Sequence, residues 1–145
     1  MIKDITWEEI LPFWELLHPG RNQKKFAKMT FKRELKWDVP EENLNINFFG
    51  DFNNNIICGV YSTHMTPNNL LRSRGIVVLS EYRKQGIATR LAKQAIKNCN
   101  LLNCDGVWAY PRVGSSLNAH LQAGYKQVSD LHESRYGTNC YVLAS

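Results

Sequence analysis

The sequence predicts a mixed α/β fold, because strand-like and helix-like patterns alternate along its 145 residues. Two runs rich in β-forming residues, 45–52 and 56–65, flank an asparagine turn at 53–55 and predict a hairpin. Residues 70–79 predict another strand, which ends in an uninterrupted apolar run typical of a strand covered on both faces. An amphipathic helix follows, and its apolar stripe comprises Ala88, Leu91, Ala92, Ala95, Ile96 and Cys99.

The first forty residues predict a short strand and two helical stretches. Residues 2–5 form the strand, and Thr6 with Glu9 has the spacing of a capping box at a helix N-terminus. Pro12 interrupts the helical pattern that follows, so we expect a kink or a delayed helix start there. The second helical stretch is expected over residues 23–36.

The C-terminal third adds, in order, a strand, a helix and two strands, expected at residues 106–110, 115–123, 125–132 and 139–143. The predicted element order is therefore β-α-α-β-β-β-α-β-α-β-β. Gly75 lies inside a predicted strand, which suggests a bulge or a close backbone approach. No repeat and no linker rich in Pro, Gly or Ser divides the chain, so we expect one domain over residues 1–145.

Composition excludes several classes of protein. Hydrophobic residues make up 43% of the chain and charged residues 21%, which is ordinary for a globular protein and argues against disorder. No apolar run is long enough to cross a bilayer and no leader pattern follows Met1, so we expect a cytoplasmic protein that does not bind a membrane. The four cysteines form no C-x-x-C pair, so we expect free thiols and no metal.

The net charge of +5 is unevenly placed. Seven basic residues fall within sixteen positions, with Glu34 as the one acid among them: Arg21, Lys24, Lys25, Lys28, Lys32, Arg33 and Lys36. Such a cluster favours an acidic partner, whether a phosphorylated molecule, a nucleic acid or an acidic protein surface. The alternative is a solvated helix face.

The chemically informative segment joins the strand at 70–79 to the amphipathic helix. It reads Glu-Tyr-Arg-Lys-Gln-Gly-Ile-Ala over residues 81–88. The first N–H groups of a helix have no partner inside it, and the helix dipole adds partial positive charge at that end. Gly86 allows close approach of a ligand to the backbone, and Arg83 with Lys84 adds charge. These features predict an anion site suited to a pyrophosphate.

The patterns G-x-x-x-x-G-K-[ST] and G-x-G-x-x-G are absent, which disfavours a nucleotide hydrolase and a dinucleotide-binding fold. The segment instead resembles the coenzyme A pyrophosphate loop of the GNAT superfamily of N-acetyltransferases. That family's pattern, [RQ]-x-x-G-x-[GA], is matched by Arg83, Gly86 and Ala88. The resemblance covers nearly the whole chain and is clearest over residues 70–125. It implies a mostly antiparallel, mixed sheet of six to seven strands flanked by about four helices.

The resemblance also implies roles for individual residues. Backbone groups of Val77, Val78 and Leu79 would pair with the pantetheine arm, as an added strand would. A backbone N–H near Val78 would stabilise the oxyanion. The residues that would hold the pyrophosphate follow the strand, with Thr89 also offering its hydroxyl: Arg83, Lys84, Gln85, Gly86, Ile87, Ala88 and Thr89.

A second family signature, N-x-x-A-x-x-x-Y-x-x-x-G-[FY], is only partly kept. Gly124 and Tyr125 match its end, whereas Val113, Ser116 and His120 replace its Asn, Ala and Tyr. The family's tyrosine lies close to the departing sulfur. A histidine can also give a proton to a departing thiolate, so His120 is a candidate general acid; the alternative is a helix histidine without catalytic part. No residue is assigned as general base.

The implied function is transfer of an acetyl group from acetyl-CoA to a primary amine by direct attack, without an enzyme nucleophile or a metal. If the basic cluster at 21–36 flanks the acceptor, it favours an acidic or phosphorylated amine. Two other functions remain open: a degenerate member that binds acyl-CoA or a partner without turnover, and a basic nucleic-acid-binding domain. Family members are often dimers, so a homodimer is an open expectation.

Overall fold

The computed structural model describes residues 1–17, 46–66, 68–134 and 137–145. Its main sheet has seven strands in the order β1-β2-β3-β4-β5-β9-β6. β4 and β5 pair in parallel, and every other pair in this sheet is antiparallel. The predicted mixed, mostly antiparallel sheet is confirmed. The predicted helix at 23–36 lies outside the described residues.

The N-terminal elements follow the sequence closely. Strand β1 (Ile2–Ile5) is followed by helix α1 (Trp7–Ile10), a 3₁₀ turn η1 (Leu11–Phe13) and helix α2 (Trp14–Leu17). The capping box forms as predicted: Thr6 N–H donates to Glu9 Oε1 over 3.0 Å, and Glu9 N–H donates to Thr6 Oγ1 over 3.2 Å. Pro12 falls in η1, because a proline lacks the N–H that a continuous α-helix would need there.

The central hairpin and the strand after it also form as predicted. β2 (Ile46–Asn53) and β3 (Ile56–Met65) pair in antiparallel, and β3 pairs with β4 (Leu70–Val78). The register between β3 and β4 shifts between Tyr61 and Thr63, opposite Gly75, whose φ of 103° few other residues adopt. The bulge predicted at Gly75 is confirmed.

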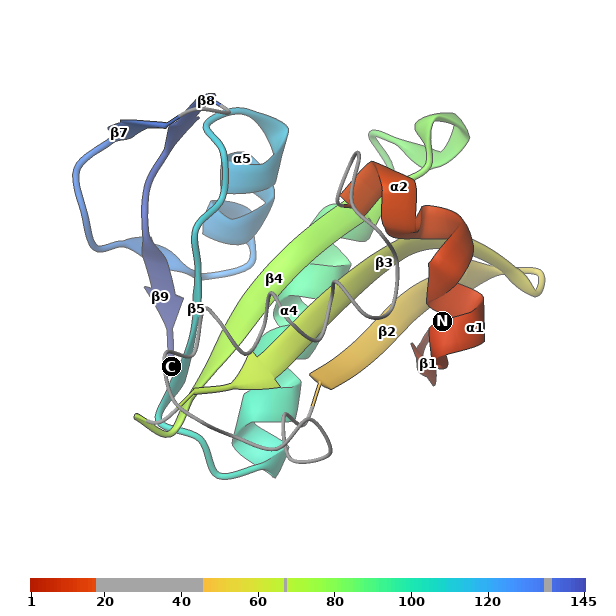
Figure 1. Ribbon diagram of the computed structural model, residues 1–145, viewed down its shortest axis with the longest axis horizontal. Helices are drawn as coiled ribbons and strands as arrows, with labels where there is room; N and C mark the ends of the chain where they lie inside the picture. Colours follow the sequence, from red (N-terminus) through yellow and green to blue (C-terminus); the bar gives the residue numbers. More distant parts are fainter. Residues whose placement is uncertain (18–45, 67, 135–136) are drawn as a thin grey trace.

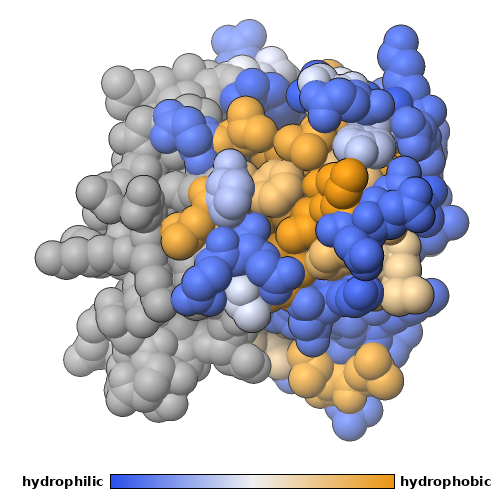
Figure 2. Space-filling model, turned by 90° about the vertical axis from the view of Figure 1, so that its right-hand side faces the viewer, coloured by the Kyte–Doolittle hydropathy of each residue, from blue (hydrophilic) through white to orange (hydrophobic). Residues whose placement is uncertain are grey.

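Helix α4 (Ile87–Leu101) packs its apolar stripe against β3 and β4, and the short α1 and α2 lie on the other face of the sheet (Figure 1). The buried residues under α4 form one continuous core, which includes Phe49, Tyr61, Leu91, Val107 and Val142. A smaller core, which includes Ile10, Phe13, Phe48 and Val60, lies under α1 and η1. On the side of the molecule where β1 and α1 lie, apolar residues gather in the middle of the surface, with hydrophilic residues above, below and to the right of them (Figure 2).

The C-terminal strands differ from prediction. β5 (Gly106–Ala109) and α5 (Ser115–Gln122) form where expected, but the expected strand 125–132 is reduced to β6 (Lys126–Gln127). A separate hairpin of β7 (His132–Ser134) and β8 (Gly137–Asn139) follows, and β9 (Val142–Ala144) returns to pair with β5 and β6. Residues 125–132 do contain strand residues, but the length and pairing of those strands depend on residues far away in the sequence.

Candidate functional site

The site begins where β4 and β5 separate. These two parallel strands pair only at Leu70–Arg72 with Gly106–Trp108, although β4 continues to Val78. Beyond Arg72, β4 has an edge that β5 does not cover. This opening is the kind of sheet edge onto which an extended ligand can add as a strand would.

The direction of the Val78 N–H follows from its neighbour. Leu79 N–H donates to Cys58 O on β3 over 2.9 Å, so Leu79 and Cys58 are a hydrogen-bonded pair. In an antiparallel ladder the adjacent pair, Val78 with Gly59, then points its backbone groups away from the partner strand. The Val78 N–H is therefore directed toward the opening, while its carbonyl accepts a hydrogen bond from Arg83 Nε at 3.3 Å.

The turn after β4 delivers the chain to the start of α4. A 3₁₀ turn, η3 (Ser80–Tyr82), is followed by two residues with positive φ: Lys84 at 64° and Gly86 at 76°. Gly86 is the N-cap, and its carbonyl accepts from Arg90 N–H over 3.0 Å. As the first residues of the helix, Ile87, Ala88 and Thr89 have N–H groups without an intrahelical partner, and no side chain among the described residues caps them. This is the geometry of an anion-binding helix N-terminus.

An ion pair fixes this turn from the side. Arg90 donates from Nε and Nη2 to Asp51 Oδ2, at 3.1 and 3.0 Å, and from Nη1 to Gln85 O at 3.0 Å. The Asp51 side chain is only 5% exposed. A buried carboxylate on β2 thus connects the sheet, through one arginine, to the backbone next to Gly86. Asp51 is committed to this structural role and is not available as a base.

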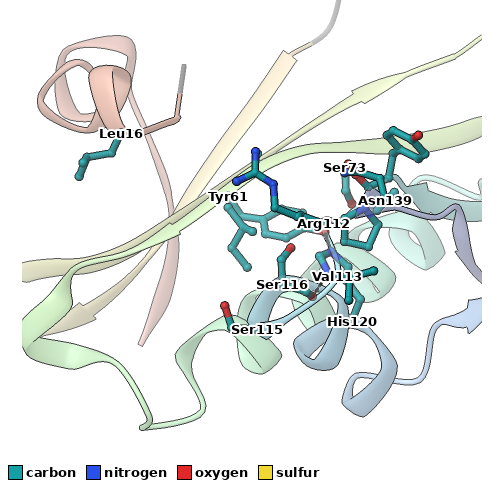
Figure 3. A pocket seen from close by; sticks show the side chains of 14 residues that line it. Leu16, Tyr61, Ser73, Arg112, Val113, Ser115, Ser116, His120 and Asn139 are labelled. Atoms are coloured by element: carbon teal, nitrogen blue, oxygen red, sulfur yellow. Dashed lines mark hydrogen bonds between the residues drawn. The ribbon is translucent and has the colours of Figure 1, made fainter. Parts of the chain in front are cut away.

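A cavity of about 490 Å³ lies between β4, β5 and α5, with Leu16 of α2 on its far side (Figure 3). Its wall includes the three positions at which the second signature departs from the family: Val113, Ser116 and His120. The remaining described lining residues are Leu16, Tyr61, Ser73, Gly75, Ile76, Ala109, Tyr110, Pro111, Arg112, Ser115 and Asn139.

His120 and Tyr61 form a hydrogen-bonded pair in the wall of this cavity. His120 Nδ1 lies 2.7 Å from Ser116 O, a carbonyl that can only accept, so Nδ1 carries the proton. Nε2 is then the acceptor, and the Tyr61 hydroxyl donates to it over 2.8 Å. Both residues are buried, with exposures of 2% for His120 and 1% for Tyr61.

Burial keeps both groups neutral. It lowers the pKa of His120 below the ordinary value of 6.5 and raises the pKa of Tyr61 well above 10. At neutral pH the pair is therefore a phenol and an imidazole without charge. The proton in the hydrogen bond between them belongs to Tyr61, so His120 alone is a poor acid in this arrangement.

Two site residues, Tyr61 and Ser73, were missed by the sequence analysis. Ser73, on β4, is 6% exposed, and its Oγ has no hydrogen-bond partner among the described residues. Both residues lie in ordinary-looking strands, and strand alternation alone gives a residue's face but not its neighbours. Their convergence on His120 comes from the pairing of β3 with β4 and the packing of α5.

The predicted cofactor residues follow one another from the end of β4 to the first turn of α4, but the Ile87 side chain is buried in the core. Arg83, Lys84, Gln85 and Gly86 are exposed there. Thr89 Oγ1 donates to Gln122 Oε1 over 3.1 Å and so links α4 to α5. The basic cluster at 21–36 lies outside the described residues. Among the residues that are described, no group of three or more His, Cys, Asp or Glu side chains could hold a metal ion.

Comparison with known proteins identifies the family. The model of the acetyltransferase (GNAT) family matches residues 7–128. The chain belongs to the GNAT acetyltransferase family. No curated protein sequence matches it.

Solved structures with the GNAT fold superimpose on almost the entire chain. An IAA acetyltransferase from Bacillus cereus ATCC 14579 is 13% identical with a TM-score of 0.71, covering 99% of this chain and 97% of that one. The spermidine N-acetyltransferase from Vibrio cholerae, in complex with CoA and spermine, is 12% identical with a TM-score of 0.72, covering 99% and 94%. An aminoglycoside 6'-N-acetyltransferase complexed with coenzyme A is 12% identical with a TM-score of 0.71, covering 99% and 96%. At these identities the likeness shows the fold. In the described part of this GNAT chain, no helix is long and apolar enough to span a membrane.

Proposed function

We propose that this GNAT protein transfers an acetyl group from acetyl-CoA to a primary amine by direct attack within a ternary complex. The observation that carries the proposal is one continuous path. It runs from the uncapped start of α4, along the uncovered edge of β4, into the cavity that Tyr61, Ser73 and His120 line. A phosphate group, an extended amide arm and a reacting thioester need these three environments in that order.

The residues present fit coenzyme A. The N–H groups of Ile87, Ala88 and Thr89, the left-handed turn at Gly86 and the side chains of Arg83 and Lys84 would hold the pyrophosphate. Among the described atoms, a Cβ added at Gly86 would meet Arg90 Nη1 alone, at 3.5 Å, so these residues leave the turn open to a ligand. Of Val77, Val78 and Leu79, Val78 would offer its N–H to the pantetheine arm, because the ladder alternation turns the backbone groups of Val77 toward β3 and Leu79 N–H is donated to Cys58.

The chain's own chemistry is to position the reactants and to handle protons. The Val78 N–H would stabilise negative charge on the thioester oxygen during attack. As the amine nitrogen forms its bond to the acetyl carbon, the C–S bond breaks, the nitrogen loses a proton and the sulfur gains one. The proposed donor to sulfur is the Tyr61 hydroxyl: its single proton, which the resting site donates to His120 Nε2, would turn to the departing sulfur, and the proton that the amine loses would restore the phenol. The proposal thereby moves the role predicted for His120 to its partner Tyr61.

The acceptor is proposed to be an acidic or phosphorylated amine, because the basic residues at 21–36 precede the strands that frame the cavity. Among the similar structures one is complexed with spermine and another is named as an aminoglycoside 6'-N-acetyltransferase, so they do not fix this choice. A homodimer remains a proposal.

A degenerate GNAT domain that binds acyl-CoA without turnover is the second candidate. One observation favours it: the α5 position of the family's tyrosine holds a buried, neutral histidine whose Nδ1 proton is donated to Ser116. The two candidates share the cofactor site and differ in whether acetyl transfer follows.

Calorimetry with coenzyme A on the wild type and on Gly86→Glu tests coenzyme A binding, which both candidate functions require. We expect micromolar binding by the wild type and its loss in the variant, because a glutamate at φ of 76° strains the turn and repels the pyrophosphate. Release of free thiol from acetyl-CoA over a panel of amines then separates the candidates. Binding without release on any amine supports the degenerate domain. Absence of binding by the folded wild type, together with salt-dependent binding to DNA or RNA, supports a nucleic-acid-binding domain.

A further inference from the structure

The cavity contains one formally charged side chain among its described lining residues, that of Arg112. Arg112 lies in the connection between β5 and α5, and its side chain reaches across the cavity toward the side on which Leu16 lies (Figure 3). No acidic partner to its guanidinium is present among the described residues. An arginine that faces a cavity without a counter-charge is available to a ligand's anion.

The position of Arg112 is built into the fold. Its backbone forms an isolated bridge with Asn139, and its side chain packs over Gly137 of β8. A Cβ added at Gly137 would lie 3.1 Å from Arg112 Nε and 3.2 Å from Arg112 Cδ, so only glycine leaves full room for the arginine stem. The β7–β8 hairpin, which the sequence did not predict, thus supports the guanidinium at the cavity.

The polar groups around Arg112 can donate hydrogen bonds to an anion. Ser115 and Ser116 begin α5 beside it, and Ser73 Oγ, which has no hydrogen-bond partner in the described part of the chain, also lines the cavity. The neutral His120 and Tyr61 offer no counter-charge to a cation. A polycationic acceptor would bring a positive charge to Arg112 without a described carboxylate in the cavity to offset the repulsion.

We propose that the amine acceptor of this cavity carries a carboxylate and that Arg112 binds this carboxylate. The inference rests on the proposed acetyltransferase function and specifies its substrate class. The planar guanidinium matches a carboxylate with two parallel N–H donors, which also orients the amine of a small acceptor. The phosphates of the donor substrate have their own site at Arg83, Lys84 and the start of α4, so Arg112 is not needed for them.

Matched amines test the substrate class. Amino acids and short peptides are compared with their C-terminal amides, O-phosphoethanolamine with ethanolamine, and spermidine serves as a polycation. We expect carboxylate-bearing amines to have kcat/KM values at least about 10-fold above their amides, since one charge-assisted bidentate pair is worth about that factor or more.

Two variants of Arg112 test whether this residue causes the preference for carboxylate-bearing amines. Arg112→Gln is expected to raise KM for the carboxylate amines about 10-fold or more, with little change in KM for the amides, and Arg112→Lys to restore part of the preference. Lys97→Gln, on the exposed side of α4, is the matched control for loss of one positive charge. The affinity for coenzyme A should stay unchanged in all three variants.

The outcomes separate this inference from the proposed function. If coenzyme A binds but the enzyme prefers spermidine, amides or the phosphorylated amine, the carboxylate inference is wrong and the acetyltransferase proposal stands. The carboxylate inference is also wrong, and the acetyltransferase proposal stands, if no carboxylate-bearing amine is acetylated and calorimetry detects no binding of such an amine to the coenzyme A complex. If coenzyme A does not bind at all, the proposed function itself fails. Equal preference for carboxylates in wild type and Arg112→Gln would remove Arg112 from the recognition.

Discussion

The hydroxyl of Tyr61 on β3 donates to Nε2 of His120 on α5 over 2.8 Å, although the two residues are 59 positions apart. The pair lies in the wall of the cavity and beside Tyr125, whose ring meets the His120 ring edge-on at 5.0 Å between centroids. A phenol from β3 is therefore present where the family's α5 tyrosine is missing.

Tyr61→Phe should lower kcat for acetyl transfer by about 100-fold or more if the phenol supplies a proton. The affinity for coenzyme A should not change, because the pyrophosphate site lies elsewhere. His120→Gln, which leaves the Tyr61 proton in place, should reduce kcat less. Stopped assays of thiol release over pH 6–9 provide the measurement. A folded Tyr61→Phe protein with full kcat and an unaltered pH profile would exclude the phenol from the chemistry.

Gly86→Asp and Gly86→Asn form a matched pair that differs in charge alone. Asp and Asn tolerate the left-handed conformation of Gly86 better than other side chains do. Each variant should therefore unfold at a temperature somewhat below that of wild type, and by a similar amount. Coenzyme A affinity should fall about 10-fold or more further in the aspartate variant, because its carboxylate occupies the anion site. Equal affinities in calorimetry would contradict an anion site at this helix end.

Ser73→Ala should separate stability from function. Ser73 Oγ is buried without a described hydrogen-bond partner, and such a group costs about 1–3 kcal/mol of desolvation. Its removal should leave the free energy of unfolding equal or higher in urea titrations. If the hydroxyl is kept for a ligand, kcat/KM should fall in the same variant. Reduced stability would indicate instead that the hydroxyl has a structural partner.

Arg90→Gln should weaken both the fold and the cofactor site. The change leaves the buried Asp51 carboxylate with less compensation and releases Gln85 O from Arg90 Nη1. We expect a loss of about 1–3 kcal/mol in the free energy of unfolding, toward the low end because the Arg90 side chain is 52% exposed. Coenzyme A affinity should fall because the turn before α4 loses a support. Lys93→Gln, on the exposed face of the same helix, should change neither quantity appreciably.

Acid should destabilise the protein through its buried histidines. Burial, with a contribution from Arg72, lowers the pKa of His64 to about 3, and burial also lowers that of His120. Unfolded histidines bind protons at about pH 6.5, so below that pH the unfolded state takes up protons that the folded state does not. The free energy of unfolding should fall as pH drops from 6.5 toward 3, with His64 contributing a slope of up to about 1.4 kcal/mol per pH unit and His120 adding to the fall below pH 6.5.

His64→Gln isolates one of these contributions. In this variant the free energy of unfolding should depend less steeply on pH between 6.5 and 4, because the contribution of His64 is removed. Urea unfolding at a series of pH values measures this slope. An unchanged slope would mean that folded His64 takes up its proton at an ordinary pKa.

The sequence by itself determined the local structure and the cofactor loop. The capping box at Thr6, the break at Pro12, the bulge at Gly75 and the helix start after Gly86 depend on neighbouring residues only, so they could be predicted from spacing and residue type. The same is true of the amphipathic α4. The predicted anion site is local for the same reason, because the end of β4, the turn and the first turn of α4 are consecutive in the chain.

Only the tertiary structure decided the rest. Tyr61 and Ser73 join His120 because β3, β4 and α5 pack together, and Arg112 reaches the cavity over Gly137 because β7 and β8 pair with each other rather than with the main sheet. The predicted strand at 125–132 was wrong for a related reason, since strand pairing depends on partners far along the chain. Contacts between residues distant in sequence leave no periodic signal in it, and it is those contacts that give His120 its partner Tyr61, bury Tyr61 in a neutral form and hold the Arg112 side chain over Gly137.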